Sequence, residues 1–254
     1  MFVAAERTSE SIPLPGRLFL LPGLAADERM YVGVRHCLRT SATEFSSKYG
    51  VALDEAFITP RLLVPHADET MEAYAQRTAA QLELKPHDVI GGCSFGGMVA
   101  AAIARAQPVA GLVLLSSALD SATQVRAAPV LNRVAQKLPF AWVRKFLASD
   151  FFLRAVFGAA APEEIELGRT MLLETPPLTL RRGGALAATY HSRAPILAPA
   201  YALHGEEDRV LKAPKLEYCT LVPAAGHGLV VSHPQLVADF LGAVTQKIYA
   251  APGS

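Results

Sequence analysis

Ser94 lies in a segment whose residue spacing is typical of a serine nucleophile. Residues 89–98 read VIGGCSFGGM, and they contain the pattern G-x-S-x-G at Gly92, Ser94 and Gly96. A sharp turn from a strand into a helix strains the backbone, and side chains two positions away would collide with it. We therefore predict that Ser94 stands at the N-terminus of a helix, where the helix dipole favours negative charge. The alternative is a glycine-rich turn with an inert serine.

A serine hydroxyl attacks a carbonyl carbon only when a base takes its proton. The best candidate for that base is His227, in the segment AAGHG (224–228). Glycines on both sides let a loop present the imidazole without steric cost. His233, directly before Pro234, is the main alternative, and His204 is expected in the turn that leads to the acid.

The base needs a carboxylate that fixes its tautomer and stabilises its cation. Asp208 is the leading candidate, because it follows an apolar strand-like run in the segment HGEEDRV (204–210). Glu206 and Glu207 lie in the same segment, and Asp120 follows another strand-like run. These three carboxylates remain alternatives to Asp208.

Strands and helices that alternate would position these residues. Short apolar runs predict buried strands at 17–23, 57–65, 87–92, 109–117, 199–205 and 216–223. Pro60 either weakens the second of these strands or places it at an edge. Helical periodicity predicts helices over 68–84, 95–107 and 234–249, and at most one helix within 25–56, near 30–38. The pattern favours an α/β fold with a mostly parallel, doubly wound sheet covered on both faces.

Residues 120–195 break this alternation, because they show helical periodicity and no good strand. We predict a helical lid (cap) inserted between two strands. The core domain would then consist of residues 1–119 and 196–254.

Composition excludes several classes of protein. The 254 residues carry 24 Lys+Arg against 23 Asp+Glu, a net charge of +1, which argues against a nucleic-acid partner. The three cysteines form no CxxC pair, so a disulfide framework or a structural zinc site is not expected. No apolar run approaches the ~20 residues that cross a bilayer. The N-terminal segment lacks the apolar stretch of a signal peptide, so we expect a cytoplasmic protein.

With these residues in view, the chain resembles the α/β-hydrolase superfamily over 17–118 and 196–249. The segments that match are LLPGLAADERMY, GGCSFGG, HGEEDRV and AAGHG followed by HPQLVADFL, and Ser94, Asp208 and His227 occur in the family's order. The resemblance implies an oxyanion hole built from the backbone N–H groups of Leu24 and Phe95, with Ala25 as the alternative first donor. Pro22-Gly23 stands where the family usually has His-Gly. No metal or organic cofactor is implied.

The segment 121–157 suggests what the lid would contact. Trp142, Phe146 and, beyond the lid, Leu229 are candidates for substrate binding, whereas the alternative is that the apolar side chains pack on the core. The segment has a single acidic residue, Asp150. Its basic residues are Arg126, Arg133, Lys137, Arg144, Lys145 and Arg154. Such a basic face would attract an anionic acyl carrier or a membrane surface. The sequence leaves the oligomeric state open.

Together these features predict a serine hydrolase that cleaves carboxylic esters of small to medium acyl or aryl substrates through an acyl-enzyme intermediate. The same groups would serve a thioesterase acting on acyl-CoA or acyl-carrier thioesters, or a C–C hydrolase of the meta-cleavage type. A hypothesis from a different class is a non-catalytic ligand-binding protein with this fold.

Overall fold

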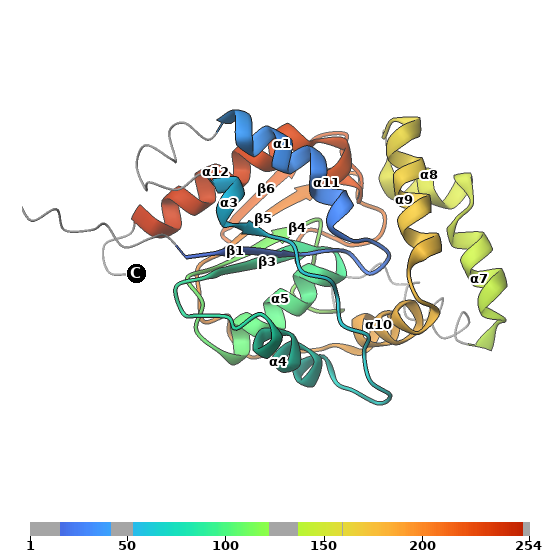
Figure 1. The fold of residues 1–254 in the computed structure, drawn as a ribbon, viewed down its shortest axis with the longest axis horizontal. Coiled ribbons are helices and arrows are strands. Elements are labelled where there is room, and N and C mark those ends of the chain that lie inside the picture. The colour runs from blue at the N-terminus through green and yellow to red at the C-terminus, as the bar shows by residue number, and fades with distance from the viewer. Residues whose placement is uncertain (1–15, 42–52, 122–136, 159, 251–254) are drawn as a thin grey trace, which may run out of the picture.

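A parallel sheet forms the centre of the molecule (Figure 1). The computed structural model describes residues 16–41, 53–121, 137–158 and 160–250. Its six strands pair in the order β2-β1-β3-β4-β5-β6, all in parallel. They are β1 (Leu18–Leu21), β2 (Phe57–Ile58), β3 (Val89–Cys93), β4 (Gly111–Leu115), β5 (Ala200–Gly205) and β6 (Tyr218–Val222). The predicted α/β class with a parallel, doubly wound sheet is confirmed.

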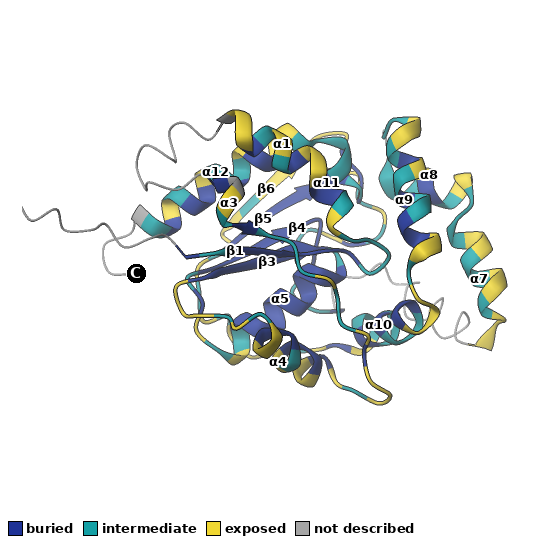
Figure 2. Ribbon diagram, in the orientation of Figure 1, coloured by how far each residue is buried: buried dark blue, intermediate teal, exposed yellow. Residues whose placement is uncertain are grey.

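Helices cover both faces of this sheet (Figures 1 and 2). On one face α1 (Val32–Ser41) packs against α12 (Pro234–Ala250), and on the other α4 (Met71–Gln81) packs against α5 (Phe95–Ala106). Every residue of β1, β3 and β4 is buried, as expected for strands covered on both sides. The strand order reverses between β1 and β3. Parallel α/β sheets bind ligands at the carboxyl ends of their strands at such a point.

Two sequence predictions about strands were wrong in detail. Only Phe57–Ile58 of the predicted strand 57–65 pairs, although it does lie at the sheet edge. The pairing stops before Pro60, which has no N–H to donate. The predicted buried strand 216–223 forms β6, but β6 is the other edge strand and most of its residues are exposed or half-buried.

Two helix predictions also differ from the structure. Residues 25–56 hold more than one helix, because the 3-10 helix η1 (Glu28–Tyr31) and the short α3 (Leu53–Ala56) accompany α1. Segments of four residues are too short for helical periodicity to show. Helix α4 begins at Met71 rather than near Asp68, since Thr70 caps it by accepting a hydrogen bond from the Ala73 N–H at 3.2 Å.

The described residues between β4 and β5 form helices and no strand, as the periodicity predicts. They are α7 (Phe140–Leu147), α8 (Asp150–Phe157), α9 (Pro162–Glu174) and α10 (Pro177–Thr189). The first three pack on one another, whereas α10 contacts α5 and contributes Leu186 to the core beside that helix. The division of the chain into a core and a lid remains a prediction.

Candidate active site

Ser94 occupies a strained turn between β3 and α5. Its backbone has φ +51° and ψ −120°, a conformation that residues with a side chain rarely adopt. The glycines on either side allow the end of β1 to pass close by. An added Cβ would lie 2.6 Å from the Leu21 carbonyl oxygen at Gly92 and 2.4 Å from it at Gly96. The predicted turn is therefore present, and packing against β1 requires its glycines.

The structure brings Ser94, His227 and Asp208 together. His227 Nε2 lies 2.8 Å from Ser94 Oγ, and His227 Nδ1 lies 2.7 Å from Asp208 Oδ2. The three residues come from the loops that follow β3, β6 and β5, so the parallel strands deliver them to one edge of the sheet. Because both ring nitrogens of His227 are occupied, none is left for Asp120. Glu206 and Glu207 are exposed residues.

Asp208 is buried and held by several donors. Its side chain is 1 % exposed, and Oδ1 accepts hydrogen bonds from the N–H groups of Val210 at 2.8 Å and Leu211 at 2.9 Å. Burial by itself would raise the pKa of Asp208. The hydrogen bond from His227 and those from the backbone outweigh burial, so the pKa lies below its ordinary value. The carboxylate is therefore ionised at neutral pH.

His204 also contacts this carboxylate, which sequence reasoning missed. It lies in β5 rather than in the turn, and it is 1 % exposed. Its Nε2 is 3.1 Å from the Leu211 carbonyl oxygen and 3.3 Å from Asp208 Oδ2. A carbonyl oxygen only accepts, so we assign the proton to Nε2. Nδ1 is buried with no hydrogen-bond partner among the described residues, and burial lowers the pKa of His204. The only hint of this contact in the sequence was that His204 lies four residues before Asp208.

The backbone amides predicted for the oxyanion hole flank Ser94. The N–H of Ala26 donates to the Gly23 carbonyl at 3.1 Å, and this turn leaves the amides of its central residues, Leu24 and Ala25, outside its own hydrogen bond. A Cβ at Gly23 would lie 3.8 Å from Ser94 Cβ, so the turn stands next to the hydroxyl. On the other side, Phe95 is the first residue of α5, and its amide has no acceptor within the helix.

The loop that carries His227 is attached to α8. The His227 N–H donates to the Val156 carbonyl at 2.9 Å, and Gly158 forms a β-bridge with Ala225. The Glu207 N–H donates to the Ala225 carbonyl at 3.0 Å, which joins the acid's loop to the same segment. Helix α8 therefore helps to set the position of the imidazole.

The three residues predicted to contact the substrate lie in different surroundings. Trp142 and Phe146 lie on α7, and their side chains are 68 % and 55 % exposed. In Figure 1, α7 lies farther from the sheet than α8 and α9 do. Leu229 is fully buried in the hydrophobic core. The spacing of bulky residues indicates an amphipathic helix, but it does not say which neighbour each face meets. The roles of these three residues in substrate binding remain predictions.

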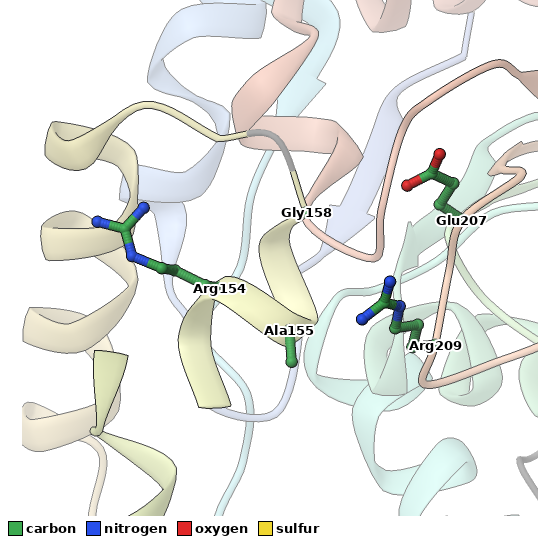
Figure 3. A pocket seen from close by; sticks show the side chains of 5 residues that line it. All are labelled: Arg154, Ala155, Gly158, Glu207 and Arg209. Carbon is green, nitrogen blue, oxygen red and sulfur yellow. The ribbon is translucent and has the colours of Figure 1, made fainter. Parts of the chain in front are cut away.

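A hollow of about 250 Å³ lies between α8 and the loop of Asp208 (Figure 3). It is lined by Arg154, Ala155, Gly158, Glu207 and Arg209. No triad residue is part of its lining. Figure 3 also shows the side chain of Arg154 pointing away from that of Arg209, so the two guanidinium groups do not converge on one ligand.

The cysteines and carboxylates offer no further chemistry in the part of the chain that the structure describes. Cys37, Cys93 and Cys219 are free thiols, and burial raises the pKa of Cys93, so this neighbour of Ser94 stays protonated. No group of His, Cys, Asp and Glu among the described residues is arranged to hold a metal ion. None of the described helices is long and apolar enough to span a membrane.

Comparison with known proteins agrees with this geometry. The sequence model of the alpha/beta hydrolase family matches residues 17–240. The chain belongs to the alpha/beta hydrolase family. This match confirms the resemblance, the fold and the expectation of an α/β-hydrolase enzyme. No curated protein sequence matches the chain.

Solved structures share the fold at low sequence identity. An esterase from Thermogutta terrifontis is 22 % identical with a TM-score of 0.68, over 92 % of this chain and 91 % of that one. An esterase from Exiguobacterium antarcticum is 14 % identical with a TM-score of 0.68, over 91 % and 92 %. MenH from S. aureus is 17 % identical with a TM-score of 0.61, over 93 % and 95 %. At these identities the likeness extends to the fold alone.

Proposed function

We propose that this α/β hydrolase cleaves carboxylic esters of small to medium acyl or aryl substrates, with Ser94 as the nucleophile. The observation that carries the proposal is the continuous hydrogen-bonded chain from Ser94 Oγ through the His227 ring to Asp208, at 2.8 and 2.7 Å. A nucleophile, its base and an orienting acid within such distances are the signature of nucleophilic catalysis by serine.

Each group has a defined role in the proposed reaction. Ser94 Oγ attacks the carbonyl carbon while His227 Nε2 takes its proton, and Asp208 stabilises the imidazolium that forms. The amides of Leu24 and Phe95 donate to the oxyanion, and one such donor lowers the barrier by about 3 kcal/mol in other enzymes. His227 then protonates the leaving alcohol, and water releases the acyl group by the same steps.

The strained backbone at Ser94 favours an enzyme over a binding protein. A non-glycine residue held in this conformation costs about 1–3 kcal/mol, which the surrounding structure must offset. A protein that only binds a ligand gains nothing from exposing a hydroxyl in this way. The fold neighbours named as esterases are consistent with ester substrates.

A fluorophosphonate probe tests this proposal. Wild-type protein should be labelled, and Ser94→Ala should not be. Ser192→Ala, altered in the segment before β5, is the matched control and should be labelled like wild type. Equal labelling of Ser94→Ala, or no labelling of wild type, would reject the proposal.

Thioesters are the second candidate, because the same catalytic groups would serve a thioester carbonyl. Exposed Lys137 and Lys145 on the predicted lid favour an anionic acyl carrier as the leaving group. Rates on matched p-nitrophenyl esters and acyl-CoA thioesters rank the two substrates. Thioester hydrolysis that falls with added salt, while ester hydrolysis does not, would identify the carrier as the true substrate.

A cytoplasmic location also remains a proposal, which cell fractionation tests.

A further inference from the structure

The outer side of α7 and the start of α8 carry an unusual group of exposed side chains. Leu138 stands just before α7, Trp142 and Phe146 lie four residues apart on α7, and Phe151 follows on α8; they are 42 %, 68 %, 55 % and 78 % exposed. We call these four residues, together with the exposed basic residues Lys137, Lys145 and Arg154 of the same segment, the α7–α8 face. Large apolar side chains gathered in this way mark an interaction site more often than scattered ones do.

The opposite side of α7 already has neighbours. Phe140, Val143 and Leu147 are half-buried, and α7 contacts α8 and α9. Phe146 reaches Phe152 of α8 with its ring at 5.5 Å between centroids, yet most of its surface stays exposed. Helix α7 is therefore apolar on two sides, and a helix of that kind is normally covered on both. Figure 2 shows that it has no fully buried residue and that its outer side is exposed.

The charge on this face is positive. Lys137, Lys145 and Arg154 are exposed, and none of them forms an ion pair with the described residues. The one acid of residues 137–158, Asp150, pairs with Arg169. An excess of basic groups therefore stands beside the apolar side chains, although the whole chain has a net charge of only +1.

From this combination we infer that the α7–α8 face docks on an anionic phospholipid surface. Aromatic and leucine side chains enter the boundary between headgroups and acyl chains, while lysine and arginine reach the anionic headgroups. Figure 1 places α7 at the outermost edge of the molecule, where a flat bilayer can approach it. A second copy of the chain is a poorer occupant, because a two-fold contact would bring Lys145 and its neighbours against the same charges.

Docking here would also affect the catalytic region. The far end of α8 bonds to the loop of His227 through Val156, as described above. A bilayer bound at this face would therefore lie against the helix that contacts the His227 loop. The inference does not depend on the proposed esterase activity, because lipid binding can be measured with Ser94→Ala.

The chain contains a single tryptophan, Trp142, so the test has a built-in probe. Full-length Ser94→Ala protein is mixed with vesicles of phosphatidylcholine, with or without phosphatidylserine. We expect a blue shift of the Trp142 emission and co-sedimentation with the anionic vesicles only, both declining with salt. Phe151→Ser and Lys145→Glu should each weaken binding about three- to tenfold.

Matched control variants are Val32→Ser, which removes an exposed apolar side chain from α1, and Lys212→Glu, which reverses an exposed charge elsewhere. Both should bind as tightly as the parent. The inference is overturned if anionic vesicles cause neither the shift nor sedimentation, or if the controls lose binding as much as the face variants. It is also overturned if the parent self-associates in size-exclusion chromatography and Phe146→Ser makes it monomeric, because the face would then bind a second copy.

Discussion

His204 Nε2 lies 3.3 Å from Asp208 Oδ2 and 3.1 Å from the Leu211 carbonyl oxygen. The Leu211 N–H in turn donates to Asp208 Oδ1 at 2.9 Å. The imidazole of His204 therefore helps to hold Leu211, whose N–H group donates to Asp208. His204 does so from within a buried strand, and its own Nδ1 finds no partner in the part of the chain that the structure describes. A buried polar atom without a partner is costly, and an aliphatic residue would fill the same space at lower cost.

Replacement of His204 should reduce kcat more than it affects KM. We expect His204→Phe to lower kcat about tenfold or more with KM within about twofold, because Asp208 loses its alignment while the substrate site is untouched. His204→Gln should recover much of the rate, since its amide can donate near the position of Nε2. The kinetics of ester hydrolysis by both variants, measured together with Tm, test this role of His204. An unchanged kcat in His204→Phe would show that the contact is not needed.

The same residue should make stability depend on pH. Burial holds the pKa of His204 below 6.5, so the unfolded chain binds a proton at higher pH than the folded one. The free energy of unfolding should therefore decrease as pH falls below about 6.5, by at most about 1.4 kcal/mol per pH unit from this group. Urea denaturation of wild type and His204→Phe at pH 7.5 and 5.5 measures this change in the free energy of unfolding. If the variant lost as much stability between these two pH values as wild type does, the pH dependence would come from other groups.

Asp208→Asn should remove most of the activity and leave the fold intact. An amide cannot stabilise the imidazolium, and it favours the wrong tautomer of His227, which costs about 10⁴-fold in kcat in a protease triad. We expect a loss of about 10³-fold or more with little change in KM. Glu207→Gln, an exposed neighbour, is the control and should keep wild-type rates. If Asp208→Asn lost less than about tenfold, the orienting acid would be another residue.

The glycines of the turn make a structural prediction. A Cβ at Gly96 would lie 2.4 Å from the carbonyl oxygens of Leu21 and Pro22, so Gly96→Ala should displace β1 or the turn and lower Tm and activity together. Gly242→Ala is the matched control, because nothing lies within 4 Å of its Cβ and it stands inside α12. That variant should be stabilised by about 0.5–1 kcal/mol. Thermal unfolding that ranks the two variants in the opposite order would contradict the packing described.

The turn at Ser94 and its partners were predictable because each is a local pattern at a strand end. Parallel strands bring their carboxyl ends to one edge, so the sequence positions of Ser94, Asp208 and His227 carried three-dimensional information. The contact of His204 was harder to foresee, because it depends on how the turn after β5 folds back to Leu211.

The helices between β4 and β5 show the limit of periodicity. The spacing of the bulky residues predicts an apolar side of a helix that includes Trp142 and Phe146. It does not show which part of the protein, or which partner, that side contacts. Arg126 and Arg133, which were part of the predicted basic lid, lie outside the described residues. The apolar run 216–223 predicts a buried strand for a similar reason, because such a run does not reveal whether the strand has one neighbouring strand, as β6 has, or two.

Mass spectrometry of the phosphonate-labelled protein tests the role of Ser94 most directly. After digestion, the adduct mass should be found on Ser94 Oγ alone, and His227→Ala should form it far more slowly, because the hydroxyl then has no base to take its proton. An adduct on any other residue, or equal rates of modification in wild type and His227→Ala, would contradict the account.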